Sequence, residues 1–190
     1  MIDIGHVVPS VSVFDADGSP CALQHYWTAR PVVLTFLRHM GCQFCKLFLG
    51  TLRSAYADFA SNGVEVVAVA QGFAPQVTHF AQSLRIPFPM VADPTRAAFH
   101  AFGLRDGAIN ELLGPTVLAR MALAASKGVL PGIRAHVPAA TSSNGSSLHQ
   151  LGGTFVIAPG GTLQYAHIAT PIYSAPTIPE LQAQIAQISR

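Results

Sequence analysis

The sequence predicts an α/β domain in which helices flank a central mixed β-sheet. Two apolar, β-branched runs, residues 32–37 and 64–70, have the composition of strands that are buried on both faces. Between them, apolar residues recur at helical spacing: Phe48, Leu52, Ala55 and Phe59. A strand, a helix and a second strand of this length form a right-handed βαβ unit. Near the end of the chain, two β-rich segments flank Pro159-Gly160-Gly161 and predict an antiparallel hairpin.

The other predicted elements complete the sheet and its helical layers. Residues 1–30 predict an N-terminal hairpin around a turn at 15–18, followed by a short helical turn at 23–27. Residues 85–92 are extended, and their two prolines favour an edge strand or an irregular approach to the sheet. Three further helices are expected. One covers 75–84 and one covers 178–188. The third begins directly after Asp93, which caps it, with Pro94 in its first position.

The composition narrows the classes of function. The chain has 190 residues, half of them apolar, and only 11% are charged, against roughly 25% in an average soluble protein. A net charge of +2 is too small to indicate a nucleic-acid partner. So few charges favour an apolar substrate groove or a subunit contact, although a surface rich in Gly, Ala and Pro is equally compatible. No secretory signal and no membrane span are expected, and three cysteines suit a cytoplasmic setting.

Two cysteines three residues apart mark the candidate active site. Cys42 and Cys45 lie where the first buried strand gives way to the first helix. Residues three apart in the first helical turn lie on one face, so small adjustments can close a disulfide. The positive end of the helix favours a thiolate, the reactive form of a thiol, and Arg38 and Lys46 act in the same direction. The pattern therefore predicts dithiol redox chemistry.

Two other interpretations of the pair remain open. The cysteines can be inert buried thiols, or they can form a three-ligand zinc or copper site together with His39. His39 can alternatively exchange a proton with Cys42, or simply be a surface residue. The third cysteine, Cys21, is expected to be structural, and Tyr165 and His167 on the late hairpin are expected to pack. No cofactor is predicted.

These features resemble a known family. The Cys-x-x-Cys at a strand-to-helix junction, the βαβ unit before a final hairpin and helix, and the opening 4–9 with Asp17-Gly18 are similar to a thioredoxin-like protein of the peroxiredoxin (AhpC/TSA) superfamily. The segments 36–45 and 151–157 resemble more closely the peroxiredoxin-like group that includes prostamide/prostaglandin F synthase-like proteins. The resemblance spans nearly the whole chain and implies a thioredoxin-like fold, residues 1–190 as one domain with an insert at 104–150.

The chain departs from both parent patterns. With Cys45 in the place of the peroxide-attacking cysteine, Cys42 replaces the threonine and Arg38 the proline of the Pro-x-x-x-Thr-x-x-Cys motif. The arginine that peroxiredoxins place near strand 154–157 is missing, since Gln150 and Leu151 stand there. Thioredoxins place a cis-proline before that strand, where this chain has Gly152-Gly153.

The two resemblances also differ on which sulfur attacks. Thioredoxin logic assigns the attack to the first cysteine and peroxiredoxin logic to the second. We favour Cys42, because it precedes the helix and should meet solvent more easily. Arg38 and His39 are further candidate site residues, and Gly153 and Thr154 are expected to supply backbone donors beside the disulfide.

The expected function is therefore that of a thiol-disulfide oxidoreductase or peroxiredoxin-like antioxidant protein. Its substrate would be a peroxide, a quinone-like molecule or a disulfide of a small molecule or protein, and a thiol such as thioredoxin or glutathione would reduce it. A homodimer is one possible assembly. Within the insert, residues 115–127 predict a helix that forms a wall of the substrate groove or a subunit contact near the cysteines, or a static decoration of the sheet.

Overall fold

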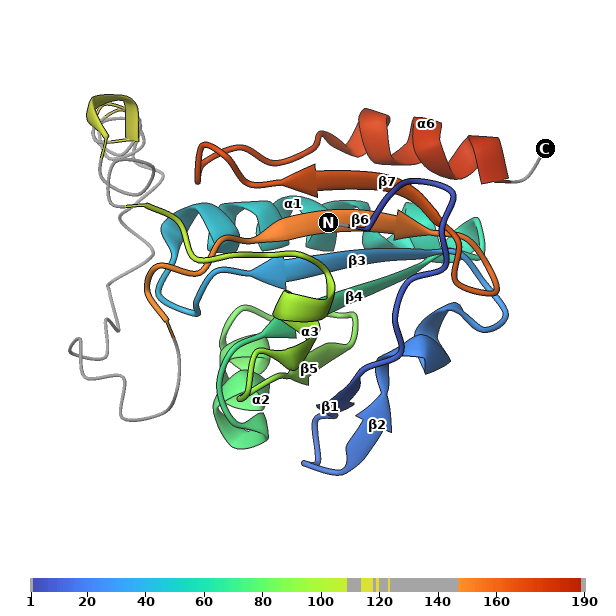
Figure 1. Ribbon diagram of the computed structural model, residues 1–190, viewed down its shortest axis with the longest axis horizontal. Helices are drawn as coiled ribbons and strands as arrows, with labels where there is room; N and C mark the ends of the chain where they lie inside the picture. The colour runs from blue at the N-terminus through green and yellow to red at the C-terminus, as the bar shows by residue number, and fades with distance from the viewer. Residues whose placement is uncertain (1, 109–113, 118, 120–122, 124–146, 189–190) are drawn as a thin grey trace.

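A computed structural model describes residues 2–108, 114–117, 119, 123 and 147–188. Seven strands form one mixed sheet in the order β2-β1-β5-β4-β3-β6-β7 (Figure 1). The strands are β1 (Ser12–Phe14), β2 (Pro20–Ala22), β3 (Val32–Leu37), β4 (Glu65–Ala70), β5 (Met90–Ala92), β6 (Gly153–Ile157) and β7 (Leu163–Ile168). The helices are the 3-10 helix η1 (Leu23–Trp27), α1 (Gln43–Ser61), α2 (Ala74–Ser83), α3 (Ala97–Ala101) and α6 (Ile178–Ile188).

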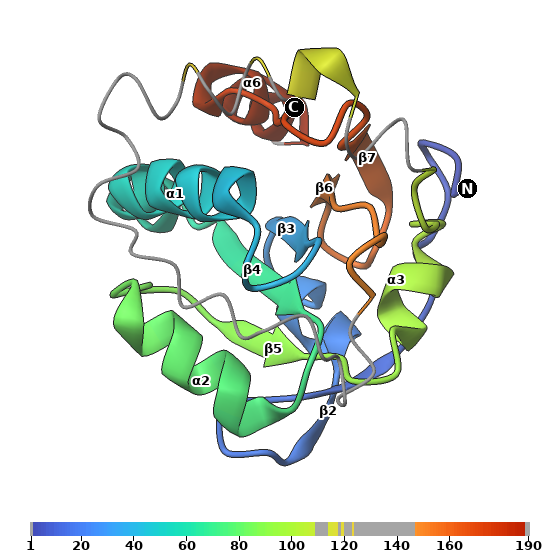
Figure 2. The same cartoon turned by 90° about the vertical axis from the view of Figure 1, so that its left-hand side faces the viewer.

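The sheet is mixed and covered on both faces, as predicted. Strands β3, β4 and β5 run parallel, whereas β6 is antiparallel to β3 and pairs with β7 in the late hairpin. Helices α1, α2 and α6 cover one face, and α3 packs on the other (Figure 2). The short helix η1 packs on the same face as α3 through Leu23 and Trp27. Successive residues of β3 therefore enter two different cores: Val33 and Leu37 face α1, while Leu34 and Phe36 face α3. This is why the strand is apolar along its whole length.

Most of the predicted elements form where the sequence places them. The N-terminal hairpin, the short helical turn, the βαβ unit and the final helix are all present. Helix α1 ends as expected, because Gly63 adopts a left-handed φ of +70° that few other residues tolerate. No helix among the described residues is both long and apolar enough to cross a membrane.

Strand β5 does not lie at the edge of the sheet, so that part of the prediction is wrong. It pairs with β4 on one side and, through Phe14 and Ala92, with β1 on the other. The prolines lie before the strand, which begins only at Met90, so they shape its approach and leave its ladder intact. The N-terminal hairpin then takes the edge position.

The helix after Asp93 begins later than its cap suggested. Asp93 does cap α3: its carboxylate accepts hydrogen bonds from the backbone N–H groups of Ala97, Ala98 and Phe99. However, Arg96 has a φ of 60°, which interrupts a helical path from Pro94. The helix therefore starts at Ala97, and Pro94 is not its first residue.

The two ends of the insert meet at the end of the sheet where β3 leads into the cysteine pair. Asp106 and Gln150 form an isolated antiparallel bridge. The N–H of Gly107 donates to the carbonyl of His149 at 2.7 Å, and that of Leu151 donates to the carbonyl of Arg105 at 3.0 Å. Of the predicted helix at 115–127, the described residues 115–117, 119 and 123 are helical, and the other positions lie outside the described residues.

Candidate active site

The two cysteines lie at the start of α1 in different backbone positions. Cys42 is the N-cap, with extended backbone angles, and Cys45 is the third residue of the helix. The sulfur of Cys42 accepts the backbone N–H of Cys45 at 3.4 Å. This is the bond that a capping side chain makes to a free N–H of the first turn. Both residues are free thiols in this structure.

Arg38 is buried beside the pair and reaches Cys42. Only 5% of the residue is exposed. Its Nε donates to the carbonyl of Gln150 and its Nη2 to that of Leu148, both at 3.1 Å, while Nη1 lies 3.8 Å from the Cys42 sulfur. In the described part of the chain no carboxylate pairs with this guanidinium. A buried cation without a carboxylate partner favours a negative charge nearby, and a Cys42 thiolate provides one.

Gln71 fixes the loop that carries Arg38. Its side-chain amide donates to the backbone carbonyl of Arg38 and to that of Ser147 at 3.2 Å. The amide oxygen accepts the N–H of Ser147 at 2.7 Å. Gln71 is 1% exposed and lies just beyond β4. The end of the insert is thus held against the active-site loop by residues from two neighbouring strands.

The two thiols have pKa values shifted in opposite directions. The hydrogen bond from the Cys45 thiol and the charge of Arg38 lower the pKa of Cys42 from 9.0 to about 6, even though burial opposes the shift. The same hydrogen bond, together with burial, raises the pKa of Cys45. Near neutral pH the favoured state is therefore a Cys42 thiolate beside a protonated Cys45.

The expectation that Cys42 is the more exposed cysteine is wrong. Cys42 is 5% exposed, whereas Cys45 is half-buried. The reason is the capping geometry, which turns the Cys42 side chain back toward the helix and toward Arg38. An attacking role for Cys42 therefore has to rest on its charge and not on its accessibility.

His39 and Lys46 contribute less than the sequence suggested. Burial, and then the charges of Arg38 and Lys46, lower the pKa of His39 to about 4, so its imidazole is neutral near pH 7. The Lys46 ammonium lies 6.0 Å from the centre of the Phe80 ring of α2. Among the described residues, no three His, Cys, Asp or Glu side chains gather closely enough to hold a metal ion. The three residues of the metal alternative are all described, and they form no such group in this structure.

Gly152 lets the chain pass very close to the active-site strand. A Cβ at this position would lie 2.6 Å from the carbonyl oxygen of Phe36 and 3.3 Å from Cγ of Arg38. Gly153 is similarly enclosed and pairs with Phe36 in the sheet. The glycines that stand in place of the thioredoxin proline therefore bring β6 close against the end of β3.

Thr154 belongs to a small polar cluster inside the sheet. Its hydroxyl lies 3.2 Å from that of Thr35, its partner on β3, and the Thr35 hydroxyl also donates to the carbonyl of Gly153 at 3.4 Å. Strand β6 pairs with β3 on one side and β7 on the other, so Gly153 and Thr154 lie within the sheet pairing. Their predicted role as backbone donors to a ligand stays a prediction.

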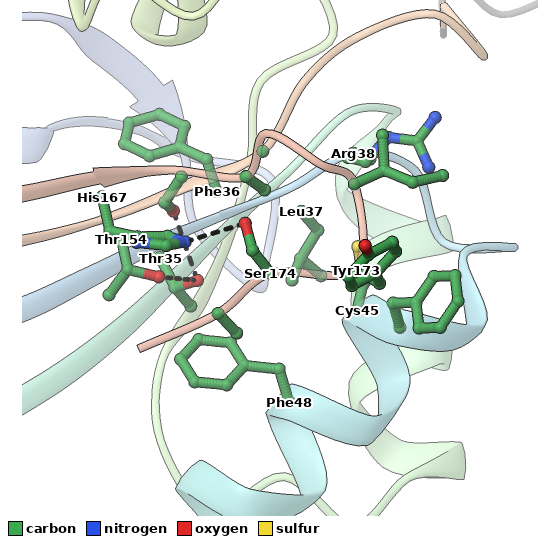
Figure 3. A pocket seen from close by; sticks show the side chains of 16 residues that line it. Thr35, Phe36, Leu37, Arg38, Cys45, Phe48, Thr154, His167, Tyr173 and Ser174 are labelled. Atoms are coloured by element: carbon green, nitrogen blue, oxygen red, sulfur yellow. Dashed lines mark hydrogen bonds between the residues drawn. The ribbon is translucent and has the colours of Figure 1, made fainter. Parts of the chain in front are cut away.

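A small cavity of about 40 Å³ opens beside Cys45 (Figure 3). It lies between the start of α1, the ends of β3 and β6, and the segment that follows β7. Most of its wall is aromatic or aliphatic, with residues that include Phe36, Phe44, Phe48, Ile172 and Tyr173. Arg38, Thr35, Thr154, His167 and Ser174 supply its polar groups.

His167 is a site residue that the sequence reasoning missed. It was expected to pack, but it lines the cavity, and its Nε2 lies 3.1 Å from the hydroxyl of Ser174 (Figure 3). On β7 it pairs in register with Thr154. That register was the available signal: if Thr154 lines a site, the residue opposite it on the hairpin lies beside the same site.

The beginning of the insert helix also reaches this region. Val117 is 2% exposed and packs with Leu151 and Ile172. Phe44 and Tyr173 lie against the same cluster, with ring centres 6.0 Å apart. The cluster that includes Val117 therefore packs against Phe44, the residue that precedes Cys45, so this part of the insert lies near the cysteines as predicted.

Comparison with known proteins identifies the family. The family model of the AhpC/TSA family matches residues 4–166. The chain belongs to the AhpC/TSA family. The chain is also similar to the prostamide/prostaglandin F synthase of Salmo salar, to which it is 23% identical over 153 residues, which cover 79% of this chain and 71% of that protein. The predicted resemblance is thereby confirmed.

Other similarities are more limited in extent or in identity. The chloroplastic thioredoxin-like protein AAED1 of Arabidopsis thaliana is 26% identical over 98 residues, which cover 52% of this chain and only 40% of that protein. The crystal structure of peroxidoxin BcpB from Mycobacterium tuberculosis superposes with a TM-score of 0.69 at 16% identity, covering 99% of both chains. At 16% identity the similarity concerns the fold alone, and it confirms the predicted thioredoxin-like fold of this chain.

Proposed function

We propose that this AhpC/TSA protein is a thiol oxidoreductase that works through a reversible disulfide between Cys42 and Cys45. The observation that carries the proposal is the environment of Cys42, whose sulfur accepts the N–H of Cys45 and lies beside the buried guanidinium of Arg38. Both contacts stabilise a thiolate, which is the nucleophilic form. Family membership supports redox chemistry of the peroxidase type.

With a peroxide as substrate, the cycle has three steps. The Cys42 thiolate attacks the terminal peroxide oxygen, the O–O bond breaks, and the alcohol or water leaves after taking up a proton. The resulting sulfenic acid of Cys42 then condenses with the Cys45 thiol, which forms the disulfide and releases water. Two electrons from an external thiol, in the class of thioredoxin or glutathione, return both cysteines to the reduced state.

The same pair can reduce other electrophiles. A disulfide of a small molecule or protein would first form a mixed disulfide with Cys42, which Cys45 would resolve. A quinone-like acceptor remains a third substrate class. A cytoplasmic location and a homodimer also stay predictions, and one relative is a chloroplastic protein.

Counting thiols by mass spectrometry tests the proposal. Reduced protein is treated with one equivalent of oxidant, alkylated, and digested. We expect Cys42 and Cys45 to lose their reactivity together and to regain it with a dithiol, while Cys21 is alkylated throughout. Cys42→Ser should abolish the paired loss, and the control Cys21→Ser should keep it. A loss of two alkylatable thiols that persists in Cys42→Ser, and that would then involve Cys21 and Cys45, would exclude this function.

A further inference from the structure

The cavity gives small molecules access to one cysteine only. Cys45 is on its wall and Cys42 is not. Cys42 is moreover 5% exposed, on the side that Arg38 closes. In the reduced protein, the sulfur that faces the cavity is therefore the protonated and weakly nucleophilic one. This arrangement suits no substrate that must meet a thiolate inside the cavity.

The cavity suits the reductive half of the cycle, in which a thiol attacks the Cys42–Cys45 disulfide. In a Cys42–Cys45 disulfide, the sulfur of Cys45 is an electrophile, and an attack on it expels Cys42. The leaving thiolate would return to the N–H of Cys45 and to the guanidinium of Arg38, which hold it in the reduced structure. Thiol–disulfide exchange is faster when the leaving thiol is the more acidic one, so attack on Cys45 is favoured over attack on Cys42.

The size and lining of the cavity define the attacking molecule. A volume of about 40 Å³ holds roughly three water-sized groups, since one water needs about 10–15 Å³ by this measure. The wall is mainly aromatic and aliphatic. The guanidinium of Arg38, which also lines it, is already bound to two backbone carbonyls and lies beside Cys42, so a charged ligand would gain little there. On β7 and the segment after it, His167 and Ser174 form a hydrogen-bonded pair that can accept a proton.

We propose that this cavity binds a small uncharged thiol, which attacks Cys45 of the Cys42–Cys45 disulfide while His167, paired with Ser174, takes up the thiol proton. The proposal rests on the proposed function, because it requires the disulfide. The bond between the thiol sulfur and Cys45 forms as the Cys42–Cys45 bond breaks, and Cys42 leaves as a thiolate. A second thiol then attacks the mixed disulfide, releases the symmetrical disulfide, and leaves Cys45 reduced.

The charged and titratable groups around His167 are few. Arg38, Cys45 and Tyr173 share the cavity wall with it, and Glu180 at the start of α6 interacts with it electrostatically. Cys45, His167 and Ser174 all line this one small cavity, so a thiol bound in it lies between Cys45 and the His167–Ser174 pair.

The position of the adduct is the first test. Oxidised protein is checked for the loss of two alkylatable thiols before any thiol is added, so failure at this step refutes the proposed function and not the cavity assignment. It is then mixed with 2-mercaptoethanol, quenched in acid within milliseconds, and mapped by mass spectrometry. We expect the adduct on Cys45 with Cys42 free. An adduct on Cys42 would overturn the proposal.

The rate of reduction is the second test. We expect 2-mercaptoethanol to reduce the disulfide at least about tenfold faster than 2-mercaptoethanesulfonate, a thiol of similar acidity that carries a permanent charge. His167→Gln should slow reduction by about 10²-fold at pH 7, the usual effect of losing a general base. The difference should narrow at high pH, where the thiol ionises in solution. The exposed His79 of α2 supplies the control His79→Gln, with no expected change.

Each result of these rate measurements decides one part of the proposal. Equal rates for the two thiols would exclude the cavity as the binding site. A His167→Gln deficit that persists unchanged at high pH would mean that His167 acts through structure and not through proton transfer. Ser174→Ala should give a smaller effect of the same pH dependence, because the imidazole remains.

Discussion

Cys42 and Cys45 are three residues apart, yet they lie in contrasting surroundings. Cys42 is buried against Arg38 and the first turn of α1, where polar contacts hold a negative charge. Cys45 is half-buried on the wall of an apolar cavity, and its pKa is raised. The difference arises because one cysteine caps the helix while the other is in its first turn. A single helix start can thus give one sulfur the charge and the other the access.

The largest expected effect is on the rate of oxidation by hydrogen peroxide, and it tests how closely the surroundings of Cys42 resemble a peroxidase site. Hydrogen peroxide should oxidise the protein at least about 10²-fold more slowly than it oxidises a true peroxiredoxin, since one lost transition-state donor costs about 10²–10³ in rate. The threonine is replaced by Cys42, and two of the Arg38 donors are bound to backbone carbonyls. Stopped-flow oxidation of both proteins under identical conditions measures the ratio. Equal rates would show that Arg38 polarises the peroxide despite these bonds.

The next effect concerns the charge on the Cys42 side. Arg38→Met should raise the pKa of Cys42 by about one unit or more, roughly 1.4 kcal/mol, because the buried positive charge is lost. Arg38→Lys is the matched control: it keeps the charge without the forked geometry and should shift the pKa less. Thiolate absorbance as a function of pH measures both. An unchanged pKa in Arg38→Met would mean that the helix start and Cys45 alone determine the acidity.

The next prediction concerns the stability of the fold and compares two glycines, one at the start of β6 beside the site and one in α1. Gly152→Ala should destabilise the fold by about 1–3 kcal/mol, since the new Cβ would overlap the Phe36 carbonyl. Gly50→Ala in α1 meets no atom within 4 Å and should be neutral or stabilising by up to about 1 kcal/mol. Urea unfolding of the two variants gives the comparison. A neutral Gly152→Ala would show that β6 can move away from β3 at little cost.

An effect of similar size is expected on the Cys45 side of the site. Val117→Ala should cost about 1–2 kcal/mol, because two buried methyl groups leave the cluster that supports Phe44 and Tyr173. Thr116→Ala, at the exposed neighbouring position, should cost much less. Reduction by 2-mercaptoethanol should change only in Val117→Ala. If both variants behave alike in stability and in rate, the insert gives no support to the cavity.

Local patterns predicted the fold, whereas long-range contacts determined the details of the site. The strands β3 and β4, helix α1 and both hairpins follow from periodicity and turn residues that lie within each segment. The internal position of β5 depends on pairing with β1, which no local pattern reveals. The burial of Cys42 depends on Arg38, which is held by carbonyls 110 and 112 residues further along the chain. The role of His167 depends on a cavity assembled from four elements.

The most direct test of the account is the alkylation rate of each cysteine as a function of pH, read by mass spectrometry on the reduced protein. A lowered pKa means that the thiolate is present above its pKa and is lost as the pH falls through it. Because Cys42 is only 5% exposed, its alkylation should be slow, but it should be lost with a midpoint near pH 6, while Cys45 stays unreactive through neutral pH. If Cys45 reacts first, or if both cysteines titrate together near their ordinary pKa, the division of charge and access between them is wrong.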